Sequence, residues 1–221
     1  MATLSQFDKP DAGQYREKRK LFLVPSIGFG RELEDDLQAL VDRFWSEVRD
    51  HVNNLERSLG AVKHVYHEML YAEGDEGLRI IEMMNPGGHG FIQALIRSTA
   101  SLEATEDMEI FGEYTDWQRC LSMGLMSQKV NRLASEGYRE SLKQRYEHIA
   151  SRIDETLGEA ECAVLFVQRD HSIQFPPGVQ VFYVAPPSLN AIDRWFDDRM
   201  REMSRAASAQ ATQGAETGGE S

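Results

Sequence analysis

Residues 21–59 read LFLVPSIGFGRELEDDLQALVDRFWSEVRDHVNNLERSL, and this stretch decides the fold class of the 221-residue chain. Its first five residues form an apolar run ending in proline, as in a buried strand, and a glycine-bearing turn follows at 26–30. From residue 32 to 59, apolar residues recur at steps of three and four, which predicts a long helix with one face on the core. That stripe consists of Leu37, Leu40, Val41, Phe44, Val48, Val52, Leu55 and Leu59. A strand followed directly by an amphipathic helix is typical of an α/β protein.

A second amphipathic segment, at 127–157, repeats this pattern. Its stripe consists of Val130, Leu133, Tyr138, Leu142, Tyr146, Ile149, Ile153 and Leu157. The other apolar runs predict strands at 61–71, 162–167 and 179–184, shorter helices between 75 and 123, and a last helix after Ser188. This order predicts an α/β fold with a mixed sheet of four or five strands, packed by two long amphipathic helices and several shorter ones.

The composition divides the chain into one domain with two flanking segments. Residues 1–19 are polar and without periodicity, so we expect a mobile N-terminal arm. Residues 20–205 carry the predicted strands and helices, which we interpret as a single α/β domain. Residues 206–221 are mainly Ala, Ser, Gln, Thr, Gly and Glu, a composition that cannot bury a core, and we expect this tail to be disordered.

The charge balance of the chain restricts the partners that it can bind. With 24 Lys and Arg against 36 Asp and Glu, the formal net charge is −12, which disfavours a broad nucleic-acid-binding surface. The N-terminus lacks the layout of a signal peptide, and no apolar run approaches the length of about 20 residues that a membrane span needs. We therefore expect a cytoplasmic protein with no membrane partner. Cys120 and Cys162 are too few for a disulfide framework, and we interpret them as buried free thiols.

The turn after the first predicted strand is one candidate ligand-binding site. Ser26, Gly28 and Gly30 precede a helix, and backbone N–H groups at the start of a helix can bind an anion. The spacing is only Gly-x-Gly, and no Gly-Lys-Ser/Thr sequence follows, so both the dinucleotide-binding and the P-loop fingerprints are incomplete. The acidic residues at 32 and 34–36 would also repel a phosphate. A plain strand-to-helix turn is the alternative interpretation.

His64, His67 and Glu68 form a second candidate site, in the predicted strand at 61–71. In a strand, His64 and His67 point to opposite faces, so they cannot bind one metal ion. His64 and Glu68 would share a face and could carry out acid–base chemistry, with Tyr66 between them. The alternative is that these residues form the polar outer face of an edge strand.

The segment Asn85-Pro-Gly-Gly-His-Gly90 is the third candidate site. Three glycines in four positions predict a mobile or tightly turned loop between two helices, with His89 exposed. Because histidine titrates near neutral pH, His89 is a candidate general acid or base, although spacing alone identifies no nucleophile or partner for it. The acidic residues between 103 and 113 lack the spacing of a calcium-binding loop, so the sequence predicts no metal site and identifies no cofactor.

Residues 145–196 resemble the C-terminal, L7Ae-like domain of the archaeo-eukaryotic release-factor and Pelota family. A helix and a short acidic turn lead into the aliphatic strand at 163–167, and a later helix carries the aromatic pair Trp195-Phe196. The sequence Gly87-Gly88-His89 is also similar to the Gly-Gly-Gln loop of that family, with histidine in the place of the glutamine. The resemblance implies a translation-linked interaction module, and the loss of the glutamine implies that peptide-release activity does not carry over.

Three hypotheses for the function follow from these observations. The first, favoured because no catalytic motif is complete, is a non-enzymatic cytosolic interaction module with a protein or ribonucleoprotein partner, associated with translation or the ribosome. The second is a small-molecule or nucleotide-binding enzyme, with its site at the carboxyl ends of the strands near 26–30 and 85–90. The third is a homo-oligomeric scaffold, because two helices of about 30 residues span roughly 40 Å each, which is longer than a compact domain needs.

Overall fold

The structure is a computed structural model that describes residues 12–27 and 33–217, with side chains described as far as Arg205. Most of the predicted N-terminal arm, residues 1–11, lies outside this part of the chain, and residues 12–15 form one 3-10 turn. The strands are β1 (Arg19–Pro25), β2 (Val62–His67), β3 (Ser101–Leu102), β4 (Cys162–Val167) and β5 (Val179–Tyr183). The α-helices are α1 (Asp35–Leu59), α2 (Gly74–Met84), α3 (Pro86–Ser98), α4 (Met108–Ser122), α5 (Gln128–Thr156) and α6 (Pro187–Thr217).

The five strands are all parallel and lie in the order β3-β2-β4-β1-β5. The α/β class is therefore confirmed, whereas the prediction of a mixed sheet is wrong. The difference arises after β4, because segment 168–178 carries the chain back to the amino end of the sheet, and β5 then pairs parallel with β1. β1 and β4 lie at the centre of the sheet and are almost completely buried, which explains their continuous apolar sequences.

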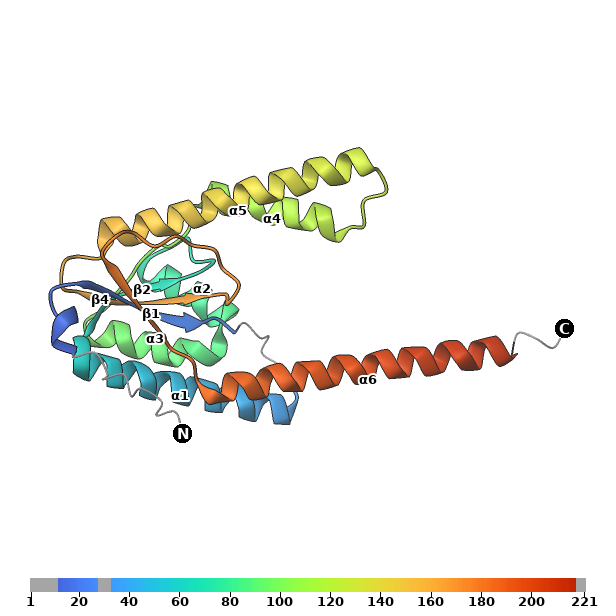
Figure 1. Cartoon of the computed structure of the whole chain (residues 1–221), viewed down its shortest axis with the longest axis horizontal. Helices are drawn as coiled ribbons and strands as arrows, with labels where there is room; N and C mark the ends of the chain where they lie inside the picture. The colour runs from blue at the N-terminus through green and yellow to red at the C-terminus, as the bar shows by residue number, and fades with distance from the viewer. Residues whose placement is uncertain (1–11, 28–32, 218–221) are drawn as a thin grey trace, which may run out of the picture.

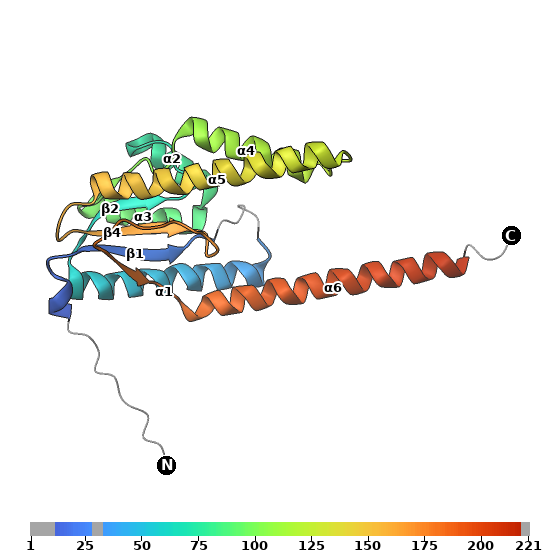
Figure 2. The same cartoon turned by 45° about the horizontal axis from the view of Figure 1, so that its top comes forward.

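Helices cover both faces of the sheet (Figures 1 and 2). One face packs against α1, α3 and the first turns of α6, through a core that includes Phe22, Val24, Phe44, Trp45, Val52, Phe91, Ile92, Leu95, Phe166, Leu189 and Ile192. The other face packs against the second half of α5 through Ile149 and Ile153. α4 pairs with α5 rather than with the sheet, and none of its residues is buried.

Two helical projections extend past the carboxyl ends of the strands, on opposite sides of the sheet (Figures 1 and 2). α4 and the first half of α5 form one, and α6 forms the other. The apolar stripe predicted for α5 is accordingly buried only where the helix crosses the sheet, and Val130 and Leu133 are 48 % and 50 % exposed. α6 continues to Thr217, through residues for which the composition predicts disorder. None of the described helices is long and apolar enough to cross a membrane.

The segment 85–90 is the beginning of a helix rather than a loop, so this prediction is wrong. Asn85 is the N-cap of α3, and its side chain accepts a hydrogen bond from the backbone N–H of Gly88. Pro86 occupies the first helical position, where its fixed φ and missing N–H cost nothing. Glycine content alone suggested a loop, but the cap and the proline are the stronger local signal.

β2 lies between β3 and β4, so the interpretation of residues 61–71 as an edge strand is also wrong. A register irregularity between Val62 and His64 changes the alternation of faces. Val62 and Val65 pack in the core beneath α1 and α3, whereas Tyr66 packs on the α5 side and stacks on His64.

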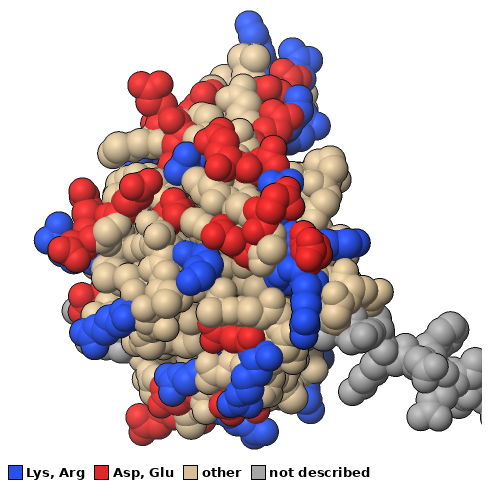
Figure 3. All heavy atoms as spheres, turned by 90° about the vertical axis from the view of Figure 1, so that its left-hand side faces the viewer, with Lys and Arg blue, Asp and Glu red and all other residues tan. Residues whose placement is uncertain are grey.

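On the side of the molecule that faces left in Figure 1, acidic and basic side chains are interspersed (Figure 3).

Candidate functional site

A cavity of about 420 Å³ opens at the carboxyl end of the sheet, between α1, the start of α3 and the residues after β1. Its apolar lining is formed by Ile27, Leu33 and Val41, and its polar lining by Gln38, Asp42, Trp45, Glu82, Asn85 and His89. The volume falls within the range of about 300–1,000 Å³ that is usual for small-molecule sites. The carboxyl end of a parallel sheet is also where open α/β folds bind their ligands.

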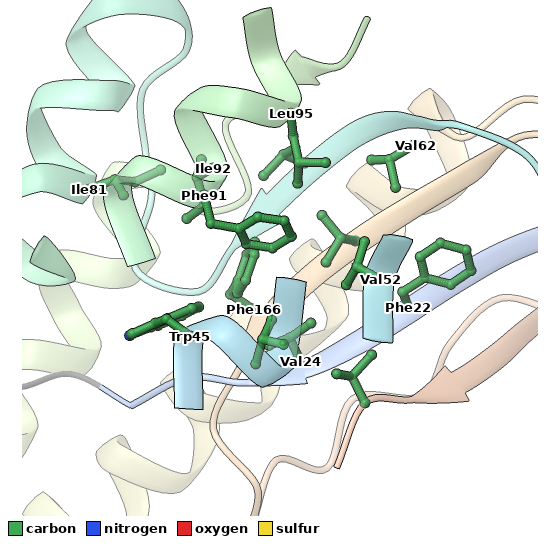
Figure 4. Packing of buried hydrophobic residues seen from close by; sticks show 14 of the residues in the cluster. Phe22, Val24, Trp45, Val52, Val62, Ile81, Phe91, Ile92, Leu95 and Phe166 are labelled. Carbon is green, nitrogen blue, oxygen red and sulfur yellow. The ribbon is translucent and has the colours of Figure 1, made fainter. Parts of the chain in front are cut away.

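The indole N–H of Trp45 is the most unusual polar group of this cavity. Trp45 is only 4 % exposed, and its Nε1 atom has no hydrogen-bond partner among the described residues. The ring packs edge-on against Phe44 and is tilted against Phe166. Its nitrogen lies at the end of the ring that points away from Phe166 (Figure 4). Because Trp45 lines the cavity, a buried donor without a partner among the described residues lies in the cavity wall.

Two glycines bring the start of α3 into close contact with Trp45. A Cβ atom at Gly87 would lie 2.7 Å from Nε1 of Trp45, and one at Gly88 would lie 2.7 Å from Cη2, so neither position can carry a side chain without displacing the ring. Gly87 is exposed and is the second residue of α3, where a backbone N–H has no partner within the helix. The indole N–H and the backbone N–H of Gly87 therefore lie close together beside the cavity, where the helix dipole adds partial positive charge.

Hydrogen bonds that lead back to β2 hold the start of α3 in place. Asn85 accepts from the N–H of Gly88 at 3.0 Å, and its Nδ2 atom lies 3.3 Å from Nε2 of His67. Nδ1 of His67 lies 2.5 Å from the carbonyl oxygen of Glu68, so we assign the ring proton to Nδ1, and Nε2 accepts from Asn85. Burial lowers the pKa of His67 to about 4, so the ring is neutral near pH 7, as this arrangement requires. His67 is thus a positioning residue for the cavity.

The cavity is also lined by acceptors. Asp42 accepts a hydrogen bond from Gln38 at 2.8 Å on the exposed side of α1, and Glu82 is exposed near the end of α2. His89 is partly exposed in the first turn of α3. Among the described residues that line the cavity there is no Ser, Thr, Cys, Lys or Arg. Among the described residues, the site therefore offers hydrogen-bond donors, two exposed carboxylates and a histidine, and no hydroxyl, thiol or amine nucleophile.

The structure brings two of the predicted segments together. Ile27, from the turn after β1, and His89 line the same cavity, as expected for a site at the carboxyl ends of the strands. Ser26 does not line it, and its backbone N–H donates to the carbonyl of Val167 at 2.8 Å. Gly28 and Gly30 lie outside the described residues.

Glu68, a predicted acid–base candidate, is instead enclosed in a buried cluster. Arg145 of α5 donates to Glu68 at 3.0 Å and to Glu106 at 2.9 Å, and all three side chains are at most 3 % exposed. The second oxygen of Glu68 accepts from the backbone N–H of Gln168, and the guanidinium of Arg145 lies 4.6 Å from the ring centroid of Tyr114. The cluster joins α5 to the carboxyl ends of β2 and β4, and it forms the root of the α4–α5 projection.

His64, the other acid–base candidate, lies on the α5 side of the sheet and outside the cavity. Its Nδ1 is 2.8 Å from Glu103 and its Nε2 is 3.1 Å from Glu161. Because both ring nitrogens face carboxylates, the charged imidazolium is favoured: the bond to Glu103 raises the pKa of His64, and the same bond lowers the pKa of Glu103. The described residues contain no group of three or more His, Cys, Asp or Glu arranged to hold a metal ion. This arrangement ties β2 to the segments after β3 and before β4.

We expect His64 to make the chain less stable at alkaline pH than at weakly acidic pH. The pKa of His64 in the folded state is raised above the ordinary value of 6.5. Its contribution to the free energy of unfolding is therefore complete below pH 6.5 and is lost as the pH rises through the raised pKa. The lowered pKa of Glu103 matters at acidic pH. The contribution of Glu103 to the free energy of unfolding is complete above the ordinary pKa of 4.5, and it is lost only as the pH falls through the lowered pKa.

Urea unfolding at about pH 5.5 and about pH 8.5 measures this difference. The free energy of unfolding should be higher at the acidic pH in the wild type, and the difference should shrink in His64→Gln. An unchanged difference in the variant would show that other groups cause the pH dependence.

Sequence reasoning missed Trp45, Gln38, Asp42 and Glu82 as site residues. Gln38, Asp42 and Trp45 recur along α1 at steps of four and three, so the helical period places them in one row beside the apolar stripe. That spacing could have identified the row, but not the α2 and α3 residues that face it. Comparison with protein-family models, with curated proteins and with solved structures finds no match for this chain.

Proposed function

We propose that this chain binds a small polar molecule in the cavity at the carboxyl end of its sheet, through the indole N–H of Trp45. The observation that carries the proposal is that Trp45 lines the cavity and that its buried indole N–H has no partner among the described residues. An unpaired buried N–H costs about 1–3 kcal/mol, and an acceptor atom of a ligand would offset that cost. The glycines of α3 support the proposal, because they let the start of α3 and the backbone N–H of Gly87 approach the indole closely.

The lining also suggests the chemical class of the ligand. The donors fit a carbonyl or carboxylate oxygen, and the carboxylates of Asp42 and Glu82 fit hydroxyl or amino groups. Ile27, Leu33 and Val41 leave room for a short apolar portion between them. The rim carboxylates and the net charge of −12 disfavour polyphosphates, so an amino acid, a nucleoside or a small sugar fits better than a nucleoside triphosphate.

Binding is better supported than catalysis at this site. His89, Asp42 and Glu82 are titratable, but no nucleophilic side chain lines the cavity among the described residues. The translation-linked function implied by the sequence resemblance stays a prediction, because the geometry of the cavity has no bearing on ribosomal partners.

A thermal-shift screen against free amino acids, nucleosides, small sugars and nucleoside triphosphates tests the proposal. A ligand that binds the folded state raises the free energy of unfolding by mass action, by about 2.7 kcal/mol at a hundredfold excess over its Kd. The unfolding midpoint rises with it. We expect a response in one of the first three classes and none from the triphosphates. A response only from the triphosphates would contradict the assigned ligand class.

Replacement of Trp45 by phenylalanine should weaken binding of the ligand found in this screen by about tenfold or more. The change removes one hydrogen bond from a buried donor, worth about 1.4 kcal/mol, while it keeps an aromatic ring in the core. Trp195→Phe is the matched control, because the indole of Trp195 donates to Asp36 at 2.8 Å outside the cavity. Titration calorimetry should find unchanged affinity in the control, and equal affinity in Trp45→Phe would exclude the indole as the recognition group.

A further inference from the structure

α6 leaves the body of the molecule at the beginning of α1. Ser188 donates to Glu47 at 2.6 Å, Trp195 donates to Asp36 at 2.8 Å, and Arg199 pairs with Glu34, which immediately precedes α1. These contacts show that α6 runs antiparallel to α1 and extends past the N-terminal end of α1 beyond about residue 199. The remaining residues to Thr217 form a projection of about 25 Å at 1.5 Å per residue.

The α4–α5 projection has a similar length and the same direction. Arg145 sits on the carboxyl ends of the strands through Glu68 and Glu106, so the residues of α5 that precede it extend past the sheet. From Gln128 to Arg145 this is also about 25 Å. Both projections point away from the carboxyl edge, one on each side of the sheet (Figures 1 and 2).

Each projection carries exposed apolar side chains. On α6, Met200 and Met203 follow one another at helical spacing and are 66 % and 64 % exposed. They continue the face that is buried against α1 at Leu189 and Ile192. At the tip of the hairpin, the exposed apolar residues are Met123, Met126, Val130 and Leu133. Contiguous exposed apolar residues of this kind mark an interaction surface.

The charges on the two projections are complementary when one tip is placed against the other root. Residues 117–135 of the hairpin contain no Asp or Glu, although the chain has 36 of them, and they carry Arg119, Lys129 and Arg132. Residues 193–205 of α6 carry four acidic residues and four arginines, so the net negative charge at the root of α6 comes from Glu34, Asp35 and Asp36 at the start of α1. A basic apolar tip and an acidic root thus occur in the same chain, on projections of similar length.

We propose that two copies of this chain associate about a two-fold axis, with the α4–α5 projection of each copy lying antiparallel along α6 of the other. Two-fold rotation reverses the direction of the projections, so each basic hairpin tip meets the acidic root of the partner's α6. The apolar residues of the hairpin then cover the stripe of α6, and the contact occurs twice. The arrangement closes on itself and leaves neither apolar surface exposed.

Sedimentation velocity of the full chain over roughly a hundredfold range of concentration gives the first test. We expect a species of twice the 25.1 kDa chain mass. Met126→Asp in the hairpin and Met203→Asp in α6 should each weaken association by at least about a hundredfold, because each change occurs twice in the interface. Met83→Asp on α2 is the matched control, since Met83 is equally exposed, at 66 %, but lies on neither projection.

Mixing the two variants distinguishes this pairing from other dimers. In a mixed dimer the two substitutions meet each other at one contact, and the second contact joins a wild-type hairpin to a wild-type α6. The mixture should therefore recover dimers that neither variant forms alone. Circular dichroism of each variant confirms that the fold is retained, as expected for changes at exposed positions.

Three results would overturn the proposal. A wild-type chain that stays monomeric at every concentration would exclude a second copy as the occupant of these surfaces. A Met126→Asp variant that remains dimeric would exclude the hairpin tip from the interface. Failure of the mixture to recover dimers, with both single variants monomeric and folded, would exclude the hairpin-to-α6 pairing.

Discussion

Replacement of Arg145 by methionine should lower the free energy of unfolding by about 3–5 kcal/mol, the largest effect that we expect from a single substitution in this chain. Arg145 is the only cation in a buried cluster with Glu68 and Glu106, and its side chain is 2 % exposed. Without it, two carboxylates stay buried with no counter-charge. Burial already raises the pKa of Glu106 against the opposing bond from Arg145, so removal of the arginine favours protonation further.

The loss should therefore depend on pH. Protonation of Glu106, whose pKa burial already raises, relieves part of the uncompensated charge, so the Arg145→Met variant should lose less stability at about pH 5 than at about pH 7.5. Urea unfolding at both pH values measures this. Arg139→Met is the matched control, because Arg139 is exposed on the same helix and its side chain donates only to the backbone of Ser135 among described contacts. A loss of less than about 1 kcal/mol in Arg145→Met would show that water or rearrangement compensates the carboxylates.

The sequence could not predict this cluster. Its members are separated by 39 and 77 residues along the chain, and they come from α5 and from the segments after β2 and β3. Periodicity along α5 identifies a row of residues that face the sheet. Arg145 lies beside that row, and nothing in the sequence indicates that this charged residue is buried. Pairing of a buried arginine with two carboxylates becomes visible only when the order of the strands is known.

The elements themselves were better predicted than their arrangement. Apolar runs identified β1, β4 and β5, and three-and-four spacing identified α1 and the inner half of α5. The direction of β5 depended on the irregular segment 168–178, which has no periodicity to interpret. β3 was missed because a two-residue strand carries no pattern of its own.

The candidate site could likewise be predicted only in part from the sequence. The convergence of the turn after β1 with His89 follows from the rule that parallel strands present their carboxyl ends at one edge, and the structure agrees. The role of Trp45 does not follow from any rule of spacing, because the residue occupies an ordinary core position of α1. Only the close approach of Gly87 and Gly88 shows that the ring packs against the start of α3, with its nitrogen beside Gly87.

Substitution of Gly88 by alanine should lower the free energy of unfolding by about 1–3 kcal/mol, although alanine is the better helix former. A Cβ atom at this buried position would lie 2.7 Å from the Trp45 ring and 2.8 Å from Nδ2 of Asn85. Either the indole or the N-cap of α3 must move, and both line the cavity. Ligand affinity should fall together with stability for this reason.

Gly90→Ala, two residues further along the same helix, should have the opposite effect. Nothing lies within 4 Å of a Cβ atom at Gly90, which is exposed, so alanine there should raise the free energy of unfolding by about 0.5–1 kcal/mol through its better helix propensity. Urea unfolding and ligand titration of both variants distinguish the effect of packing from the effect of helix propensity. If both substitutions stabilise the chain, the start of α3 does not press against Trp45 in solution. The opposite signs would instead establish that glycine is required where the helix meets the indole and not where it meets solvent.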